Sequence, residues 1–235
     1  MPSAYCMTQQ RTWDREYKNL SLVSGSFEPT KDAKDFAHFL KKERGTLAGL
    51  QILDLGSGIG KNAHFFAERG AFVTGIEMSD TALAVARTRV KETDTHALYQ
   101  KGNIGAPLPF PDNSFDAVLD VLSSNSLSEK ERGIYLKETA RVLKPCGYML
   151  VKALSKDGDK NAKKLLKKFP GAEKDTCVLP ETGITERIFS EADIRALYGK
   201  IFTVVSLKKT SHYPRVLGRI YKRNYAILVL QNSRA

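Results

Sequence analysis

A chain of 235 residues is long enough to bury one good hydrophobic core, and 42% hydrophobic with 27% charged residues is ordinary for a soluble globular protein. No apolar run approaches the ~20 residues that a membrane helix needs, which argues against a membrane-spanning chain. The net charge of +11 is uneven, because residues 1–150 contain 19 Lys and Arg against 18 Asp and Glu, whereas residues 151–235 contain 18 against 8. Nearly all of the positive excess therefore lies in the last third of the chain.

The three cysteines, Cys6, Cys146 and Cys177, are odd in number and widely spaced. This pattern favours reduced thiols over a disulfide framework or a cysteine-based zinc site. The first residues lack the charged-then-apolar pattern of a secretory signal, so we expect a cytoplasmic protein. None of the four histidines pairs with another at the spacing of metal ligands, and we expect no metal site.

The first two thirds of the chain predict a polar N-terminal arm and then alternating strands and helices. Residues 11–29 form the arm, and residues 31–44 predict an amphipathic helix. The alternation that follows is typical of a parallel sheet covered on both faces. Its expected strands are residues 51–55, 71–76, 96–100, 115–121 and 148–154. One helix is expected to begin near Thr81, after a Ser79 or Asp80 cap. Another is expected to run from the Ser128–Glu131 capping box to Leu143.

The last third predicts an insertion followed by two closing strands. Residues 157–169 look like a short basic helix, residues 176–189 look extended, and Ser190 begins a helix that runs through Tyr198. Strands are expected at residues 202–207 and 225–230. The connection between them carries many basic residues and is too long for a tight hairpin.

The most informative stretch is residues 52–60, where an apolar run ends in Asp54 and a glycine-rich turn opens into a helix pattern. Glycines there allow a sharp turn and a close approach of a ligand to the main chain. Glu77 ends the next apolar run, about 20 residues on, where nucleotide-binding folds hold ribose hydroxyls. These features predict a cofactor with an adenosine part. The G-x-G-x-G spacing differs from the dinucleotide fingerprint, and a carboxylate two residues before Gly56 suits a cation better than a pyrophosphate.

Four further blocks follow in order, at Glu77-Met78, Gly102-Asn103-Ile104, residues 108–120 and residues 138–148. Together with residues 52–60, they resemble the motifs of class I S-adenosylmethionine-dependent methyltransferases over roughly residues 50–154. The resemblance implies S-adenosylmethionine as the cofactor, a ligand that carries an ammonium and a sulfonium. Asn103 stands where the family usually has Asp, and its amide oxygen still accepts a hydrogen bond.

The resemblance also implies roles for individual residues. The methionine part of the ligand would lie against the first turn, Glu77 would hold the ribose, and Met78, Asn103 and Ile104 would surround adenine. A Trp-Asp-x-x-Tyr pattern in the arm resembles a segment that folds over the cofactor in small-molecule methyltransferases. The expected cofactor residues are Asp54, Gly56, Ser57, Gly58, Gly60, Glu77, Met78, Asn103, Ile104, Trp13 and Tyr17.

The acceptor site is less well marked in the sequence. Asp120 follows the fourth strand, where the family places residues near the transferred methyl, and we name it as the catalytic candidate, with a loop cap as the alternative. Asn125 lies at the expected mouth of the site, and His212 with Tyr213 lies in the basic connection. The Asn/Asp-Pro-Pro-aromatic motif of enzymes that methylate base amines is missing, since the chain has Asp120-Val121-Leu122-Ser123 at that point.

The expected fold is a doubly wound α/β sandwich with a seven-stranded, mostly parallel sheet in one domain. Residues 1–45 would form the N-terminal arm and helix, 46–154 the cofactor-binding core, and 155–235 the acceptor-side insertion and last two strands. The expected function is methyl transfer by in-line displacement to a small molecule. The alternatives are an RNA methyltransferase that uses the basic C-terminal third, and a non-catalytic protein that binds the cofactor or nucleic acid. A nicotinamide oxidoreductase fits least well.

Overall fold

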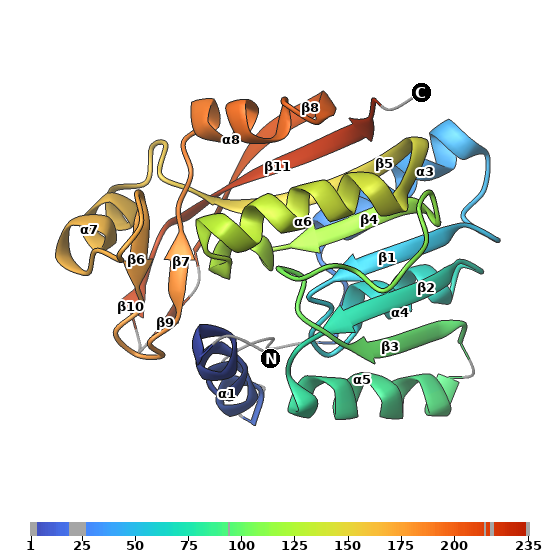
Figure 1. Cartoon of the computed structure of the whole chain (residues 1–235), viewed down its shortest axis with the longest axis horizontal. Coiled ribbons are helices and arrows are strands. Elements are labelled where there is room, and N and C mark those ends of the chain that lie inside the picture. The colour runs from blue at the N-terminus through green and yellow to red at the C-terminus, as the bar shows by residue number, and fades with distance from the viewer. Residues whose placement is uncertain (1–3, 19–26, 94, 214, 217–218, 234–235) are drawn as a thin grey trace.

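The computed structural model describes residues 4–18, 27–93, 95–213, 215–216 and 219–233, with side chains described except at residues 4–8, 215–216 and 219–220. Within this part, seven strands form one sheet in the order β3-β2-β1-β4-β5-β11-β8 (Figure 1). The antiparallel strand β11 separates β5 from β8. This arrangement confirms the predicted fold class. The strands are β1 (Gln51–Leu55), β2 (Phe72–Glu77), β3 (Ala97–Lys101), β4 (Phe115–Val121), β5 (Leu143–Ser155), β8 (Phe202–His212) and β11 (Arg223–Asn232).

Helices cover both faces of the sheet, and each face has its own apolar core. On one face, α6 (Glu129–Val142) and α8 (Glu191–Tyr198) contribute Tyr135 and Tyr198, both almost fully buried. On the other face, α3 (Lys31–Arg44), α4 (Lys61–Ala67) and α5 (Asp80–Thr93) contribute Phe36, Phe66 and Leu83. Coverage of both faces explains why β1 and β4 are buried along most of their length and are mostly apolar rather than alternating.

The predicted helix starts lie at or beside the expected cap residues. Ser128 and Ser190 each form a complete capping box, with Glu131 and Asp193 as the third residue of the helix. The Ser79 hydroxyl accepts a hydrogen bond from the Ala82 amide and so caps α5.

The N-terminal arm differs from its expected form, because residues Ala4–Lys18 form helix α1. This segment lacks a strong apolar stripe, and polar contacts with the rest of the molecule hold it. The Asp14 carboxylate accepts from the Ser79 hydroxyl at 2.7 Å, and the Gln9 side chain donates to the Ser126 carbonyl at 2.8 Å. Tertiary contacts of this kind are invisible to a local sequence pattern. Residues 19–26 of the expected arm lie outside the described part.

The basic connection at residues 208–224 is also different, because β8 and β11 extend into it as a long hairpin. Residues 208–212 are mostly exposed, so this end of β8 lacks the apolar alternation that marks a half-buried strand. The short strands β9 (Arg215–Val216) and β10 (Arg219–Ile220) pair at the tip. Their side chains lie outside the described part.

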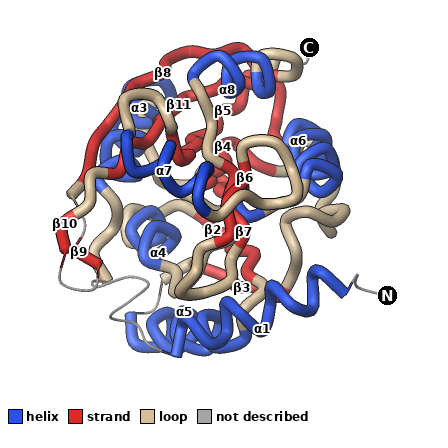
Figure 2. The backbone as a smooth tube through the Cα atoms, turned by 90° about the vertical axis from the view of Figure 1, so that its left-hand side faces the viewer, coloured by secondary structure: helices blue, strands red, loops and turns tan. Residues whose placement is uncertain are grey.

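The insertion after β5 forms helix α7 (Lys160–Lys168) and the two-stranded pair β6 (Thr176–Val178) and β7 (Thr185–Arg187). The parallel strands in Figure 1 point toward the side where this insertion and α1 lie, and Figure 2 looks onto that side. In such sheets, ligands bind outside the carboxyl ends of the strands. No helix in the described ranges is long and apolar enough to span a membrane.

Candidate functional site

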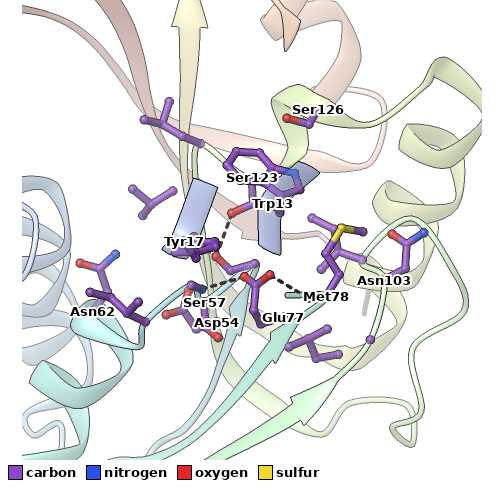
Figure 3. A pocket seen from close by; sticks show the side chains of 18 of the residues that line it. Trp13, Tyr17, Asp54, Ser57, Asn62, Glu77, Met78, Asn103, Ser123 and Ser126 are labelled. Carbon is purple, nitrogen blue, oxygen red and sulfur yellow. Dashed lines mark hydrogen bonds between the residues drawn. The ribbon is translucent and has the colours of Figure 1, made fainter. Parts of the chain in front are cut away.

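A cavity of about 310 Å³ lies at the carboxyl ends of the parallel strands. Its walls come from the turns after β1, β2, β3 and β4, with α1 and the β6–β7 insertion as further walls. In Figure 3, Trp13 and Tyr17 reach in from α1, while Asp54, Ser57 and Glu77 reach in from the ends of β1 and β2. The structure therefore brings together residues that are more than 60 positions apart in the chain.

The turn after β1 is held open by glycines that have left-handed backbone angles. Gly56 and Gly58 have φ of 68° and 55°, and both line the cavity. A Cβ atom on Gly58 would lie 2.6 Å from the Tyr17 hydroxyl, which leaves no room for a side chain. Gly60, with φ of 77°, begins α4, and a side chain there would collide with the Tyr99 hydroxyl. Gly60 is a packing residue and does not line the cavity.

Glu77 at the end of β2 is fixed in position by main-chain donors. One carboxylate oxygen accepts from the Gly58 amide at 2.9 Å, and the other accepts from the Met78 and Ser79 amides at 2.8 Å each. Burial raises the pKa of the Glu77 carboxyl, while these three hydrogen bonds act in the opposite direction. The carboxylate therefore ties the glycine turn to the end of β2 and still faces the cavity.

Asp54 at the end of β1 is buried and incompletely paired. It is 2% exposed, and its Oδ2 atom has no hydrogen-bond partner among the described residues. Burial, with further repulsion from Asp120 and Glu77, raises the pKa of Asp54 to about 7. A buried carboxylate without a partner is unfavourable. A cationic ligand group in the cavity would supply the missing partner.

The other end of the cavity is lined by Met78, Asn103 and Ile104, as the sequence predicts. The Asn103 side-chain oxygen accepts from the Gly105 amide at 2.8 Å, and its nitrogen donates to Glu131 at 3.4 Å. The side chain thus stabilises its own turn as well as lining the cavity. An amide oxygen has a second lone pair for a ligand donor.

Helix α1 closes one side of the cavity through a set of polar anchors. Asp14 accepts from the Ser79 hydroxyl and from the Thr81 amide at 3.2 Å, at the start of α5. The Arg15 guanidinium donates to the Thr182 carbonyl at 2.7 Å, which joins α1 to the insertion. Between these anchors, the Trp13 and Tyr17 rings lie 6.1 Å apart and line the cavity.

Asp120 does not line the cavity, contrary to its predicted catalytic position. It is 0% exposed and accepts hydrogen bonds from the Ser123 and Ser124 amides and, at 2.5 Å, from the Tyr135 hydroxyl. These contacts fix the chain at the start of the short helix η1 (Ser124–Ser126). The geometry matches the loop-cap alternative, because the Asp120 carboxylate makes its hydrogen bonds with internal groups of the described chain.

The predicted acceptor residues also lie away from the cavity wall. Asn125 is buried, and its side-chain oxygen accepts from the Leu154 amide at 3.4 Å. His212 and Tyr213 are exposed at the end of β8, where the His212 ring packs edge-on against Tyr225 with centroids 5.4 Å apart. The extension of β8 carries both residues away from the position expected for a loop.

Three charged residues that line the cavity were not predicted from the sequence: Lys61 at the start of α4, Lys152 on β5 and Glu186 on β7. Lys152 forms a buried ion pair with Asp32, with an Nζ–Oδ2 distance of 2.6 Å. A lysine in the middle of an apolar strand pattern is a signal that was available for Lys152. Glu186 lies in a segment with no clear pattern, and only the fold brings it to the cavity.

Comparisons with known proteins agree with this geometry. Residues 52–147 match the family model of a methyltransferase domain. The demethylmenaquinone methyltransferase of Tropheryma whipplei (strain Twist) is 40% identical over 140 residues, which cover 57% of this chain and 56% of that relative. The chain spans about half the length of the curated relatives it matches.

Solved structures share the fold at lower identity. An S-adenosylmethionine-dependent methyltransferase from Methanosarcina mazei has a TM-score of 0.69 at 24% identity, covering 78% of this chain and 92% of that one. A Burkholderia thailandensis 1,6-didemethyltoxoflavin-N1-methyltransferase, solved with 1,6-didemethyltoxoflavin and S-adenosylhomocysteine, has a TM-score of 0.72 at 15% identity, covering 100% and 93%. At these identities, the structures show a shared fold.

Proposed function

We propose that the chain is a class I S-adenosylmethionine-dependent methyltransferase that transfers a methyl group from S-adenosylmethionine to a small-molecule acceptor, as the methyltransferase-domain match and the similar proteins suggest. The observation that carries the proposal is the Asp54 carboxylate, which is buried, faces the cavity and has one oxygen without a hydrogen-bond partner among the described residues. Fixed acidic side chains beside a glycine turn suit a ligand that carries positive charge.

The residues around the cavity fit the parts of S-adenosylmethionine in order along the sheet. Asp54 would accept from the ammonium, and the Ser57 hydroxyl, which has no hydrogen-bond partner among the described residues, lies in the turn that follows β1. Glu77 would hold the ribose hydroxyls in the orientation that its main-chain bonds fix. Met78 and Ile104 would contact the adenine ring. This set of acidic and apolar groups matches the charge and shape of the cofactor.

When bound, S-adenosylmethionine supplies a methyl group on a cationic sulfur, and this sulfur is the leaving group when an acceptor atom attacks the methyl carbon in line. The protein then has to hold an acceptor atom about 3–3.5 Å from that methyl carbon and to exclude water. Helix α1 and the β6–β7 insertion enclose the cavity from outside and serve this exclusion. When ionised, Asp54 and Glu77 place negative charge near the donor site.

We further propose a quinol or a similar aromatic hydroxyl compound as the acceptor. The relatives from Tropheryma whipplei and Shewanella are named for demethylmenaquinone methylation and for ubiquinone and menaquinone biosynthesis. Methyl transfer from a sulfonium needs an electron-rich acceptor, so the reduced quinol is the reactive form. Val121, Leu122 and Leu127 give the cavity an apolar wall that suits an aromatic ring.

The test is a label-transfer assay with methyl-labelled S-adenosylmethionine and separated metabolite, RNA, DNA and protein fractions. We expect label in the metabolite fraction, and the product mass would identify the acceptor. The Gly58→Val variant is the control, because its side chain would fill the space beside Tyr17 and abolish transfer. Label in nuclease-sensitive RNA would replace the small-molecule proposal with the RNA alternative, and no transfer to any fraction would contradict both.

A further inference from the structure

Part of the cavity is not needed by the cofactor in the arrangement proposed above. The donor residues come from the ends of β1, β2 and β3, on one side of the sheet centre. The remaining wall comes from the next strands along the sheet, with Leu122 after β4 and Lys152 on β5, and from Glu186 on β7. This second side is where an acceptor would meet the donor.

Glu186 is an unpaired carboxylate in this second side. The side chain is half-buried and lines the cavity, and it has no hydrogen bond or ion pair with any described residue. Its strand partner Cys177 is fully buried in a small apolar cluster with Leu154 and Ile188. A carboxylate held against apolar neighbours without a donor is unfavourable for folding alone. Such a group is expected where it contacts a ligand.

The two lysines that line the cavity differ in whether they form an ion pair. Lys152 is neutralised by Asp32, with which it forms a buried ion pair at 2.6 Å. Lys61 has no hydrogen bond or ion pair with any described residue, and burial together with Lys152 lowers the pKa of its ammonium. The acceptor side therefore carries one carboxylate and one ammonium that form no hydrogen bond or ion pair with a described residue, although the Arg223 charge acts on Glu186 from a greater distance.

We propose that Glu186 accepts the proton of a weakly acidic acceptor hydroxyl, on a phenol or quinol, as the methyl group is transferred. This inference rests on the proposed function. The Glu186 carboxylate takes the hydroxyl proton, and the acceptor's electron pair forms the new bond to the methyl carbon. The bond between sulfur and that carbon breaks, and its electron pair stays on sulfur. If a ring carbon attacks, its hydrogen then moves to the neighbouring oxygen and the ring regains its hydroxyl. The negative charge that develops on the acceptor oxygen suits the unpaired Lys61 ammonium.

The direction of the pKa shift of Glu186 is compatible with a role as a proton acceptor. Burial raises the pKa of the Glu186 carboxyl, and the Arg223 guanidinium opposes this shift. A raised pKa makes the carboxylate a stronger base than an exposed glutamate. The wild-type rate should therefore fall as pH is lowered through that raised pKa, because the protonated carboxyl cannot accept the acceptor's proton.

The experiment compares Glu186→Gln with Glu181→Gln, an exposed glutamate on the same insertion that gives an equal charge change. The probe acceptors are 1,4-naphthalenediol and catechol, held reduced under anaerobic conditions. We expect Glu186→Gln to lower kcat by about 10²–10³-fold and to remove the loss of rate at low pH. Its affinity for S-adenosylhomocysteine, measured by calorimetry, should stay within about twofold of wild type, because only a positioning or folding defect would change it. Glu181→Gln should match wild type in every measurement.

Three results would count against the inference in distinguishable ways. If wild type methylates a probe and Glu186→Gln keeps both the rate and the pH profile, the role of Glu186 is wrong and the proposed function stands. Transfer only to acceptors that lack an acidic hydroxyl would overturn both the role of Glu186 and the proposed quinol acceptor, while methyl transfer to a small molecule would stand. If wild type transfers methyl to no acceptor, the inference and the proposed function fall together.

Discussion

Asp54 and Glu77 are both buried carboxylates at neighbouring strand ends, and they differ in their hydrogen bonds. Glu77 accepts three main-chain bonds, whereas one Asp54 oxygen has none among the described residues. Hydrogen bonds stabilise the charged form of a carboxyl, so Glu77 is better compensated for its burial. Asp54 is the residue whose charge state a ligand would change most.

The affinity for S-adenosylhomocysteine should therefore depend on pH through Asp54. The folded-state pKa of Asp54 is raised to about 7, and a ligand ammonium binds the ionised form. Affinity should be greatest above that pKa and should fall by up to about tenfold per pH unit below it. Calorimetric titrations between about pH 5.5 and 7.5 measure this, with Asp54→Asn as the control that binds weakly and with little pH dependence. A flat wild-type profile would show that Asp54 does not meet the ligand's ammonium.

The same raised pKa gives a stability prediction with a definite sign. A carboxyl whose pKa is higher in the folded than in the unfolded state binds more protons when folded, so it lowers the free energy of unfolding as pH rises from about 4 to 7. Asp54→Asn should remove this loss and melt higher than wild type at about pH 8, where the wild-type carboxylate is charged and buried. Thermal melts of wild type and Asp54→Asn at two pH values measure the effect. The prediction is contradicted if, at the higher pH, Asp54→Asn melts at the same temperature as wild type or at a lower one.

Residues that line the cavity could be predicted where the pattern is local in sequence, and their binding roles stay predictions. Four of the predicted residues line the cavity, namely Asp54, Gly56, Gly58 and Glu77. They were predictable because a strand, a glycine turn and the end of a second strand are each recognisable from residues close together in the sequence. The catalytic role of Asp120 was inferred from its place after β4, but its side chain turns to Tyr135 and to the amides of the next turn. Which way a side chain points at a strand end depends on its neighbours in space, and the sequence does not give them.

At the scale of elements, α1 is held over the cavity by few contacts, and Asp14 is central to them. Asp14→Ala removes the acceptor for the Ser79 hydroxyl and the Thr81 amide. Hydrogen bonds to a charged group contribute about 1.5–3 kcal/mol, so we expect at least a tenfold weaker affinity for S-adenosylmethionine. The melting temperature should change little, because α1 lies outside both large cores.

The matched control for this variant is Asp35→Ala, which removes an exposed carboxylate on α3. Its affinity should equal that of wild type. Wild-type affinity in Asp14→Ala would mean that α1 does not close over a bound ligand, whatever its place in the free protein.

Element prediction followed the strength of the local signal. The buried strands and the capped helices α6 and α8 were located to within a few residues at most positions, because apolar runs and capping boxes are local. The exposed end of β8 was missed, because a strand without a buried face lacks the alternation used to find it. Helix α1 was missed for the related reason that polar tertiary contacts hold it.

At the scale of the whole molecule, the basic excess after residue 150 is partly explained by α7. This helix turns Ala162, Leu165 and Leu166 toward a small apolar cluster, while Lys163, Lys164, Lys167 and Lys168 are exposed. Such an arrangement is typical of a solvated helix face. It gives no specific support to the RNA alternative, which stays open for the label-transfer assay.

Replacing these four lysines with glutamine should leave methyl transfer unchanged in rate and in salt dependence. Neutralising a solvated face removes charge without removing a contact at the cavity, whereas loss of phosphate contacts would weaken acceptor binding and make it less dependent on salt. Steady-state rates at two salt concentrations measure the difference. A large loss of activity relative to wild type, greatest at low salt, would favour a nucleic-acid acceptor.

The central claim is that the cavity at the carboxyl ends of β1 and β2 binds S-adenosylmethionine through its buried carboxylates. The most direct measurement is a calorimetric titration of S-adenosylmethionine into wild type and into Glu77→Gln. The account predicts saturable binding that S-adenosylhomocysteine displaces, and an affinity about 10–100-fold weaker in the variant, as expected for a lost charged hydrogen bond. No binding to wild type, or equal binding by a folded Glu77→Gln protein, would contradict it.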